Sequence, residues 1–416
     1  MSRVRRLQDY AEFVGPEELR EIWSLVRHVE GATMVHVNST RMGGGVAEIL
    51  EAMIPLLNSV GVSARWEVIE PLPGFFSFTK ALHNGLQGAP FVLRQEQVDT
   101  YARCQQLNAS RLDLNADCVI IHDPQPAGLI RHRAEGRSRW VWRCHIDLSA
   151  PDPVAWGFLR PYVEQYDASI FSIPAFAQQL PHNQFMIEPS IDPLNDKNRD
   201  LDVRTVQDVL ERYGIDPERP IITQVSRFDA MKDPMGVIRA FREVRRREDC
   251  QLVLAGGGAS DDPEGQQVLA QVREEASHDP DIHVLELPPE SDLEINALQR
   301  ASTIIVQKSL REGFGLTVTE ALWKGKPVVA GAVGGIRRQV IHGFTGFLVR
   351  SVEGLAYRLR QLLHDPSLRQ ALGSNGREHV RNNYLITRHL KDYLLLLLAV
   401  RYPDADITDL AGAGHP

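Results

Sequence analysis

The chain has 416 residues, of which 43% are hydrophobic and 24% charged, with 31 glycines and 25 prolines. This composition excludes fibrous and disordered classes, and the length predicts two or three domains that need neither disulfides nor a structural metal. The 46 Lys and Arg against 54 Asp and Glu leave a net charge of −8. Nucleic acid is therefore not expected as the main partner, and any anionic ligand must meet a local cluster of basic residues.

Cysteine usage and the termini indicate a cytoplasmic protein. The four cysteines, Cys104, Cys118, Cys144 and Cys250, are widely scattered and have the character of reduced core residues. No apolar segment follows the basic N-terminus, and the longest apolar run covers only 393–400. We therefore expect neither a signal peptide nor a membrane partner.

Short apolar runs alternate with helical patterns along the first half of the chain. An amphipathic segment at 16–29 is followed by expected strands at 33–38, 64–69, 118–123, 140–145 and 168–173. Short apolar runs separated by crossover helices are typical of a parallel sheet that is covered on both faces.

The pattern lapses into Pro, Asp and Asn at 187–200, which predicts a hinge. A second series of expected strands follows at 220–226, 251–256, 282–287, 303–307, 326–331 and 345–349. We predict an α/β fold of two Rossmann-like doubly wound domains, 1–188 and 189–385, facing each other across a deep cleft. Helical patterns at 366–383 and 386–401 follow, and the last is expected to pack back on the first domain.

Two glycine-rich turns are candidate ligand cradles. In RMGGGV (41–46), Gly44 and Gly45 would let the backbone approach a diphosphate or a sugar hydroxyl at a helix N-terminus, although a simple tight turn remains the alternative. In GAVGGIRRQV (331–340), we predict free N–H groups at 333–336 that form a second anion cradle.

Basic residues follow two of the strands expected in the second half. SRFDAMKDP (226–234) offers the planar donor fork of Arg227 and the mobile charge of Lys232, and Lys308 follows a later strand. Solvated loop charges are the alternative interpretation.

The most specific motif is EGFGLTVTE (312–320). It places Glu312 in a glycine-containing loop and Glu320 near the start of a helix. Eight helical residues would span about 12 Å, whereas the carboxyl pair of a retaining glycosidase lies only about 5 Å apart. The two glutamates therefore more plausibly hold different parts of one ligand, unless they are simply an N-terminal helix carboxylate and an exposed loop carboxylate.

Polar residues end two strands of the first half. They are His122 and Asp123 in IIHDPQP, and His145 and Asp147 in WRCHIDLS. Each taken singly is more often structural than catalytic, and His36 is interpreted as structural. No His, Cys and Asp set has metal-ligand spacing, and the P-loop lysine motif is missing.

These motifs together resemble a known family. SRFDAMKDP, followed about eighty residues later by EGFGLTVTEALWKGKPVVAGAVGG, resembles the donor-binding half of the retaining GT-B glycosyltransferases of family 4, in which Glu312 and Glu320 fit the Glu-x7-Glu mark. WRCHIDLS, IIHDPQPAGL and PSIDPLNDKN further resemble the trehalose glycosyltransferring synthases. The resemblance implies a retaining transfer of glucose from a nucleoside diphosphate, UDP or ADP, to free glucose, which forms trehalose.

The resemblance also implies roles for individual residues. Arg227 and Lys232 would bind the diphosphate, Glu320 the ribose, and Glu312 the transferred glucose, with His145 over the donor sugar. The implied catalytic residues are Glu312, His145, Arg227 and Lys232. The implied donor-binding residues are Gly44, Gly45, Arg227, Lys232, Lys308, Gly313, Phe314, Gly315, Leu316 and Glu320. The implied acceptor-binding residues are His122, Asp123 and Asp147.

Four other functions stay open at this point. A trehalose phosphorylase of the same family would use phosphate in place of the nucleotide, and another family 4 hexosyltransferase would use a different acceptor. A nicotinamide-dependent oxidoreductase is disfavoured because neither glycine-rich turn reads GxGxxG, and a nonenzymatic sugar sensor would leave the charged set without a purpose. No metal is required for the chemistry that we expect, while stimulation by Mg²⁺ and a homodimer are left open.

Overall fold

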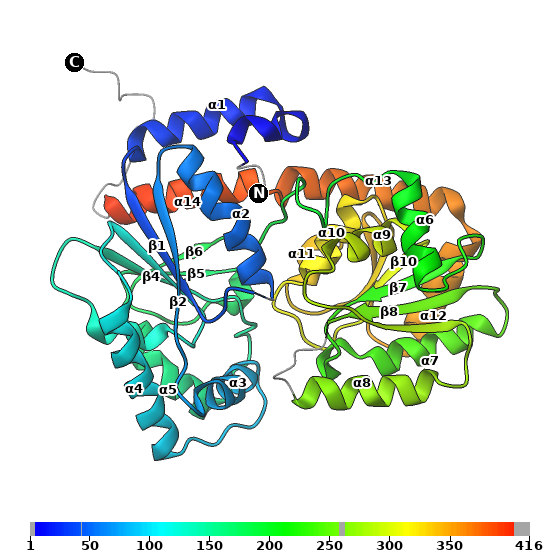
Figure 1. The fold of residues 1–416 in the computed structure, drawn as a ribbon, viewed down its shortest axis with the longest axis horizontal. Coiled ribbons are helices and arrows are strands. Elements are labelled where there is room, and N and C mark those ends of the chain that lie inside the picture. The colour runs from blue at the N-terminus through cyan, green and yellow to red at the C-terminus, as the bar shows by residue number, and fades with distance from the viewer. Residues whose placement is uncertain (1–4, 43, 258–262, 403–416) are drawn as a thin grey trace. The chain divides into compact units, whose positions relative to one another are not determined.

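The computed structural model describes residues 5–42, 44–257 and 263–402, so that Gly43 of the first glycine-rich turn lies outside the described residues. The chain forms two compact units that divide between Ser190 and Ile191, inside the segment expected to be a hinge, and the helix Ile386–Arg401 returns to the first unit (Figure 1). Each unit contains one six-stranded sheet. The predicted α/β class with two doubly wound sheets is confirmed.

The first sheet has the order β2-β1-β3-β4-β5-β6, and all of its pairs are parallel. Its strands are β1 Thr33–Asn38, β2 Ser63–Val68, β3 Cys118–His122, β4 Arg139–Arg143, β5 Ala168–Phe171 and β6 Asn183–Met186. The helices of this unit are η1 Leu7–Tyr10, α1 Ala11–Val29, α2 Gly45–Ser59, α3 Phe75–Leu86, α4 Gln95–Arg111, η2 Ala127–His132, α5 Pro153–Val163, η3 Pro174–Phe176 and α14 Ile386–Arg401.

Strand β6 is absent from the sequence prediction. It pairs only with β5, at the edge of the sheet, and its residues are exposed or half-buried. An edge strand of four residues, NQFM, needs neither an apolar run nor a clear alternation, so the pattern gives little sign of it.

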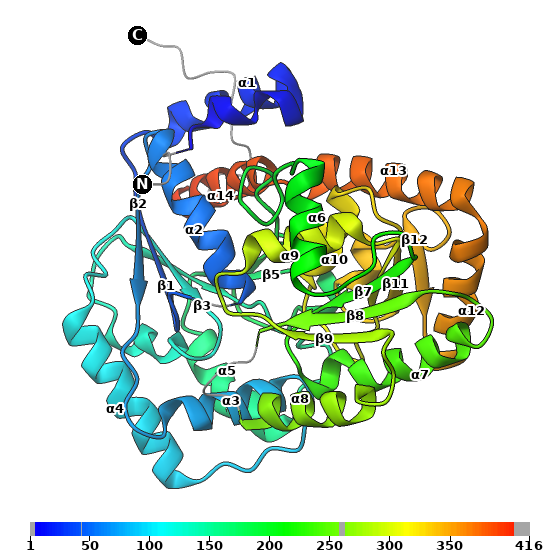
Figure 2. The ribbon, with the colours of Figure 1, turned by 45° about the vertical axis from the view of Figure 1, so that its right-hand side comes forward.

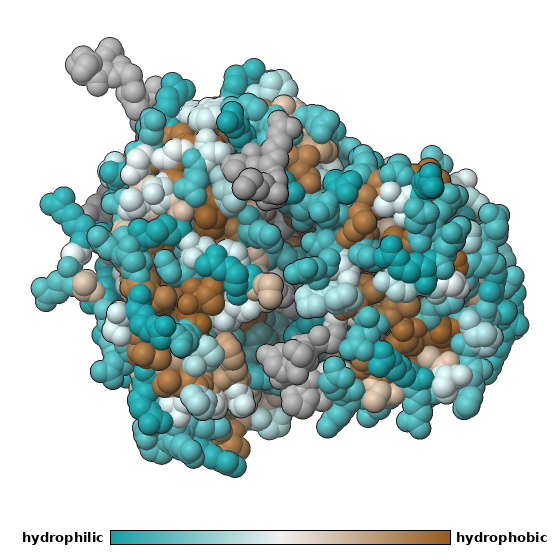
Figure 3. Space-filling model, viewed as in Figure 1, coloured by the Kyte–Doolittle hydropathy of each residue, from teal (hydrophilic) through white to brown (hydrophobic). Residues whose placement is uncertain are grey.

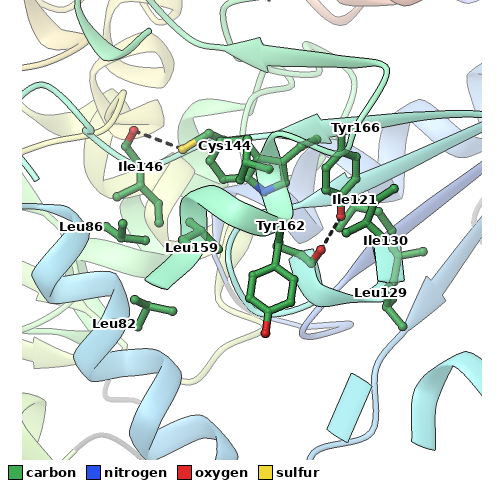
Figure 4. Packing of buried hydrophobic residues seen from close by; sticks show 14 of the residues in the cluster. Leu82, Leu86, Ile121, Leu129, Ile130, Cys144, Ile146, Leu159, Tyr162 and Tyr166 are labelled. Atoms are coloured by element: carbon green, nitrogen blue, oxygen red, sulfur yellow. Dashed lines mark hydrogen bonds between the residues drawn. The ribbon is translucent and has the colours of Figure 1, made fainter. Parts of the chain in front are cut away.

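One face of the first sheet carries the main core of its unit. Val35, Val37, Ile121 and Trp142 belong to this cluster, together with buried residues of α3, α4 and α5. Figure 4 shows part of it from close by, with Leu82 and Leu86 of α3 beside Leu159 of α5. Because successive side chains of a strand point to opposite faces, the intervening residues face the other side of the sheet.

Helix α14 packs on α1 and α2, and the three helices lie together in both ribbon views (Figures 1 and 2). The ring centroid of Tyr393 in α14 lies 5.5 Å from that of His36 in β1. Helix α14 therefore covers the face of the sheet opposite the main core. The leucine run at 394–398 is therefore mostly core. In the described part of the chain, every helix is too short or too polar to cross a membrane.

The second sheet has the order β12-β11-β10-β7-β8-β9 and is also parallel throughout. Its strands are β7 Ile221–Val225, β8 Gln251–Gly256, β9 Ile282–Glu286, β10 Ile304–Gln307, β11 Val328–Gly331 and β12 Gly346–Val349. The helices are α6 Val203–Arg212, η4 Ala230–Lys232, α7 Pro234–Arg245, α8 Pro263–Ala276, α9 Asp292–Ala301, α10 Leu316–Trp323, α11 Ile336–Gln339, α12 Val352–His364 and α13 Pro366–Asn383.

Each sheet has a point at which the strand order reverses. In the second sheet it lies between β7 and β10, and in the first between β1 and β3. Loops on either side of such a point leave in opposite directions and open a crevice beyond the carboxyl ends of the strands, where ligands of open α/β sheets bind. On the face drawn in Figure 3, hydrophobic residues form separate patches among hydrophilic ones.

Candidate active site

Three loops meet at the carboxyl end of the second sheet. They follow β7, β10 and β11, which are neighbours in the sheet, and they contain the motifs at 226–234, 312–320 and 331–340. The Leu310 N–H donates to the Met231 carbonyl at 2.8 Å, and the Gly335 N–H donates to the Gly313 carbonyl at 3.0 Å. Backbone hydrogen bonds therefore join motifs that are far apart in the sequence.

Lys232 and Glu312 form an ion pair between two of these loops. Lys232 Nζ lies 2.5 Å from Glu312 Oε2, and the side chains are 17% and 10% exposed. The Ser309 hydroxyl donates to the same oxygen at 3.1 Å, and the Gln224 amide donates to the Lys232 carbonyl at 3.0 Å. The prediction of a mobile Lys232 is therefore wrong, because the ammonium is held against a carboxylate with little exposure to water.

Lys308 forms a second buried ion pair, with Asp233. Asp233 has a positive φ of 48°, and its other carboxylate oxygen accepts the Gly236 N–H at 3.0 Å at the start of α7. Lys308 thus links the β10 loop to the first turn of α7. This pairing favours a positioning role for Lys308 over the direct grip on the donor that the resemblance implied.

Arg227 is the most open of the basic residues in this group. Its side chain is 56% exposed, and its guanidinium lies 3.7 Å from the Asp229 carboxylate. An ion pair this long and exposed is weak. The planar fork of donors is consequently accessible to an incoming anion.

The loop from Glu312 to Gly315 is fixed by its neighbours. Gly315 has φ +85° and precedes α10, while the buried Phe314 ring packs edge-on against Tyr384. The Gln339 amide donates to the Phe314 carbonyl at 2.5 Å and accepts the Thr319 hydroxyl at 2.6 Å. The sequence analysis missed the roles of Gln339 and Asp233, although both lie inside quoted motifs, and it missed Ser309 just before 312–320. Their partners come from other loops, so the local sequence does not mark them.

Glu320 lies in the middle of α10 and is 2% exposed, deeper than its predicted place near the helix start. Lys324 follows one turn later, and its ammonium donates to Gln299 Oε1 at 2.7 Å and to the Glu320 carbonyl at 3.3 Å. Burial lowers the pKa of Lys324 to about 7, and the negative charge of Glu320 partly offsets this by raising it. The contact of Glu320 with a ribose stays a prediction.

The predicted anion cradle at 333–336 needs correction. The Val333 N–H donates to the Gly331 carbonyl at 2.8 Å and the Gly335 N–H is used by Gly313, so two of the four groups are not free. Gly334 has φ +44°, and a Cβ there would lie 1.7 Å from the Glu312 carbonyl oxygen. The turn is glycine-rich because it passes against the Glu312 loop, which is a structural reason.

In the first unit, Gly44 and Gly45 form the start of α2. Gly44 is exposed with φ +87°, and a Cβ added there would meet nothing within 4 Å. Open space and a left-handed backbone at the N-terminus of a fifteen-residue helix are compatible with the predicted approach of a phosphate or sugar. Leu316, the other predicted residue at a helix start, is the first residue of α10 and is half-buried.

Asp123 and His145 lie at neighbouring strand ends. Asp123 has a positive φ of 65°, and its carboxylate accepts a hydrogen bond from the backbone N–H of His145 at 2.7 Å. Burial raises the pKa of Asp123 to about 7, while the hydrogen bond from His145 and the charge of Arg143 lower it. The nearby Asp147 carboxylate accepts the Ser149 N–H at 2.9 Å. Both carboxylates therefore shape the loops that follow β3 and β4.

His122 is 3% exposed, and both of its ring nitrogens are engaged. They lie 3.0 Å from His36 Nδ1 and 3.0 Å from His145 Nε2. No ring nitrogen of His122 is left for a sugar, which argues against its predicted direct contact with the acceptor. His36, interpreted as structural from the sequence, is fully buried and forms the far end of a histidine chain that reaches His145.

The described residues contain no group of three His, Cys, Asp or Glu side chains arranged as metal ligands.

Comparisons with known proteins match both units of the chain. Residues 36–178 match the family described as "Trehalose synthase, N-terminal domain", and residues 206–379 match "Glycosyl transferases group 1". An α,α-trehalose-phosphate synthase (UDP-forming) from Burkholderia xenovorans superposes with a TM-score of 0.71 at 14% identity, over 88% of this chain and 100% of that chain. The fold and the matched domains define a group 1 glycosyltransferase with the GT-B fold.

Two curated relatives narrow the class. A trehalose synthase from Pyrococcus horikoshii is 46% identical over 402 residues, which cover 95% of this chain and 97% of that protein. A trehalose phosphorylase from Pleurotus pulmonarius is 30% identical, over 90% of this chain but only 58% of that protein. The chain belongs to the trehalose synthase family of glycosyltransferases.

The contact between Gly334 and Glu312 yields a stability prediction. Gly334→Ala is expected to lower the free energy of unfolding by about 3 kcal/mol or more, because left-handed strain adds to a clash with a carbonyl oxygen. Gly343→Ala is the matched control, since Gly343 also has a positive φ of 79° but open space around the added Cβ. It should lose only about 1–2 kcal/mol. Equal losses in urea denaturation would contradict the close approach.

The raised pKa of Asp123 predicts a pH dependence. A carboxyl whose pKa is higher in the folded than in the unfolded chain stabilises the fold only when protonated, so this contribution is lost as the pH rises from about 4 to about 7. Asp123→Asn keeps an acceptor for the His145 N–H and removes the ionisation. The variant should gain stability relative to wild type over this range and hold the gain above pH 7.

Urea midpoints at several pH values between 5 and 8.5 measure the difference. Asp147→Asn removes a carboxylate from the next strand end and serves as the control. Parallel pH profiles for wild type and Asp123→Asn would refute the assignment to Asp123.

Proposed function

We propose that the protein is a retaining glucosyltransferase that forms trehalose from a nucleoside-diphosphate glucose, UDP- or ADP-glucose, and free glucose, in a reaction that can run in both directions. The observation that carries the proposal is the Lys232–Glu312 pair, which joins the two halves of the motif at the carboxyl end of the second sheet. The similarity to trehalose synthases over nearly the whole chain supports it.

Arg227 and Lys232 are assigned to the diphosphate. Breaking the bond between C1 of glucose and the diphosphate leaves negative charge on the departing oxygen. Cations that are already in place stabilise such charge without a cost of reorganisation at the moment of reaction. Lys232 is held before any ligand arrives, and Arg227 is open to receive one.

Glu312 is assigned to the transferred glucose, where positive charge develops at C1 as the bond breaks. Its Oε2 already accepts from Lys232 and from Ser309, which makes it a poor nucleophile and a suitable electrostatic partner. The acceptor hydroxyl then attacks C1 on the face that the diphosphate leaves, and its proton passes to the departing phosphate oxygen. Retention follows without a glycosyl-enzyme intermediate.

Apart from Lys308 and His122, the remaining site residues keep the roles that the resemblance implied. Glu320 binds the ribose, and the backbone at Gly313, Phe314 and Gly315 follows the donor sugar. In the first unit, Gly44 and Gly45 approach the phosphate, His145 contacts the donor sugar, and Asp123 and Asp147 shape the acceptor pocket.

The substrate proposal predicts a defined product. Incubation with free glucose and UDP-glucose or ADP-glucose should yield an α,α-1,1-linked disaccharide and release the nucleoside diphosphate, measured by chromatography and NMR of the linkage. Trehalose and inorganic phosphate, tested in parallel, should give no glucose 1-phosphate. Phosphorolysis without any response to UDP or ADP would favour a trehalose phosphorylase instead.

Removal of either partner of the ion pair should lower turnover steeply, and the charge left unpaired should also lower the free energy of unfolding, so kcat is compared on folded protein. We expect Lys232→Ala and Glu312→Ala each to lower kcat by about a hundredfold to a thousandfold, the range typical of a lost electrostatic group. Arg242→Ala and Glu275→Ala break an ion pair between α7 and α8 in the same unit and serve as controls. Near-wild-type kcat in Lys232→Ala or Glu312→Ala would refute the site assignment.

A further inference from the structure

Three histidines of the first unit form a hydrogen-bonded column. His36 lies in β1, His122 at the end of β3, and His145 just after β4. His36 Nδ1 lies 3.0 Å from His122 Nε2, and His122 Nδ1 lies 3.0 Å from His145 Nε2. Each neighbouring pair of rings is stacked with centroids 5.3 Å apart.

Met34 closes the buried end of this column. Its Sδ lies 3.1 Å from His36 Nε2, and Met34 and His36 are both fully buried. A thioether sulfur accepts hydrogen bonds and has no hydrogen to donate. The proton of a neutral His36 is therefore favoured on Nε2, where it points at the sulfur, and Nδ1 of His36 is left as an acceptor.

The protonated nitrogen of His36 fixes which ring nitrogen is protonated in each of the next two histidines. A neutral imidazole carries one N–H and one bare nitrogen. His36 Nδ1 accepts, so His122 Nε2 must carry the proton, and His122 Nδ1 is then bare. His145 Nε2 must in turn donate to it. The remaining nitrogen, His145 Nδ1, is left unprotonated, and it has no partner among the described residues.

The surroundings keep all three rings neutral. Burial lowers the pKa of His36 to about 3 and those of His122 and His145 well below the usual value for histidine. The fully buried guanidinium of Arg143 acts on His122 and His145 in the same direction. From α14, the rings of Tyr393 and the buried His389 face this side of the sheet, and His389 also disfavours a charge on His145.

We propose that Met34, His36 and His122 are positioning residues that hold His145 as its neutral Nε2–H tautomer, so that the bare Nδ1 accepts a hydrogen bond from a hydroxyl of a substrate sugar. The tautomer follows from the column alone, whereas the hydroxyl partner rests on the proposed function. His145 is half-buried, while the other two histidines of the column are buried. The column therefore fixes Nδ1 of His145 as a hydrogen-bond acceptor, on the histidine that is most accessible to a ligand.

The tautomer is directly measurable. Long-range ¹H–¹⁵N correlation spectra of protein labelled with ¹⁵N-histidine distinguish a protonated from a bare ring nitrogen. The chain has fourteen histidines, and the signals of the three column members are assigned by their loss in His36→Phe, His122→Phe and His145→Phe. We expect Nε2–H and bare Nδ1 for His36, His122 and His145 between pH 6 and 8. A protonated Nδ1 on His145, or an imidazolium, would overturn the proposal.

Met34→Leu tests the origin of the polarity. The change conserves volume approximately and removes the sulfur acceptor. Because one neutral hydrogen bond biases an equilibrium by roughly fivefold, the Nδ1–H form of His145 should rise from a minor species to about half. Met53→Leu replaces a buried methionine of α2 in the same unit and should leave all three tautomers unchanged. A His145 signal that is identical in wild type and Met34→Leu would remove Met34 from the proposal.

The hydroxyl contact is tested by titration. Addition of glucose, UDP-glucose or ADP-glucose should move the ¹⁵N resonance of His145 Nδ1 in the direction of a hydrogen-bonded acceptor while Nε2 stays protonated. If no sugar moves the Nδ1 resonance, the acceptor role fails although the tautomer stands. If a sugar moves it but no disaccharide forms, the reaction proposed above fails and the His145 contact survives.

Discussion

The loops at the carboxyl end of the second sheet are organised around one buried ion pair. Lys232 and Glu312 come from loops eighty positions apart in the sequence, and each is exposed by less than a fifth. Two charges so far out of water are tolerated because each satisfies the other and because Ser309 supplies a further donor. The same pairing holds a cation and a carboxylate in place before a ligand binds, which is the arrangement that electrostatic catalysis requires.

Close packing of loops around this pair explains much of the local sequence. The turn after β11 passes so near the Glu312 carbonyl that only glycine fits at position 334, and Gly335 donates its N–H to Gly313. Gly331 likewise approaches the Ser309 carbonyl, where a Cβ would lie 2.3 Å away. Glycines that resemble an anion cradle in the sequence therefore serve first to let three loops meet beyond the carboxyl ends of adjacent strands.

The first unit uses the corresponding place in its own sheet differently. From the reversal point between β1 and β3 to the end of β4, it holds three neutral histidines linked through ring nitrogens, with a thioether at the buried end. Buried polar groups are costly when unpaired and specific when fully paired. The second unit holds a charged pair, Lys232 and Glu312, in place. In the first unit, a chain of neutral rings sets the tautomer of His145 at its end.

The sequence by itself determined the two doubly wound sheets, eleven of their twelve strands, and the motifs with Arg227, Lys232, Glu312 and Glu320, because apolar periodicity and glycine spacing are local signals. It missed β6, an edge strand with no apolar pattern, and it placed Lys232 and the amides at 333–336 in the open. Only the tertiary structure decided that Lys232 pairs with Glu312, Lys308 with Asp233, and His36 with His122. The physical reason is that a partner contributed by a distant strand or loop leaves no trace in the spacing of either residue.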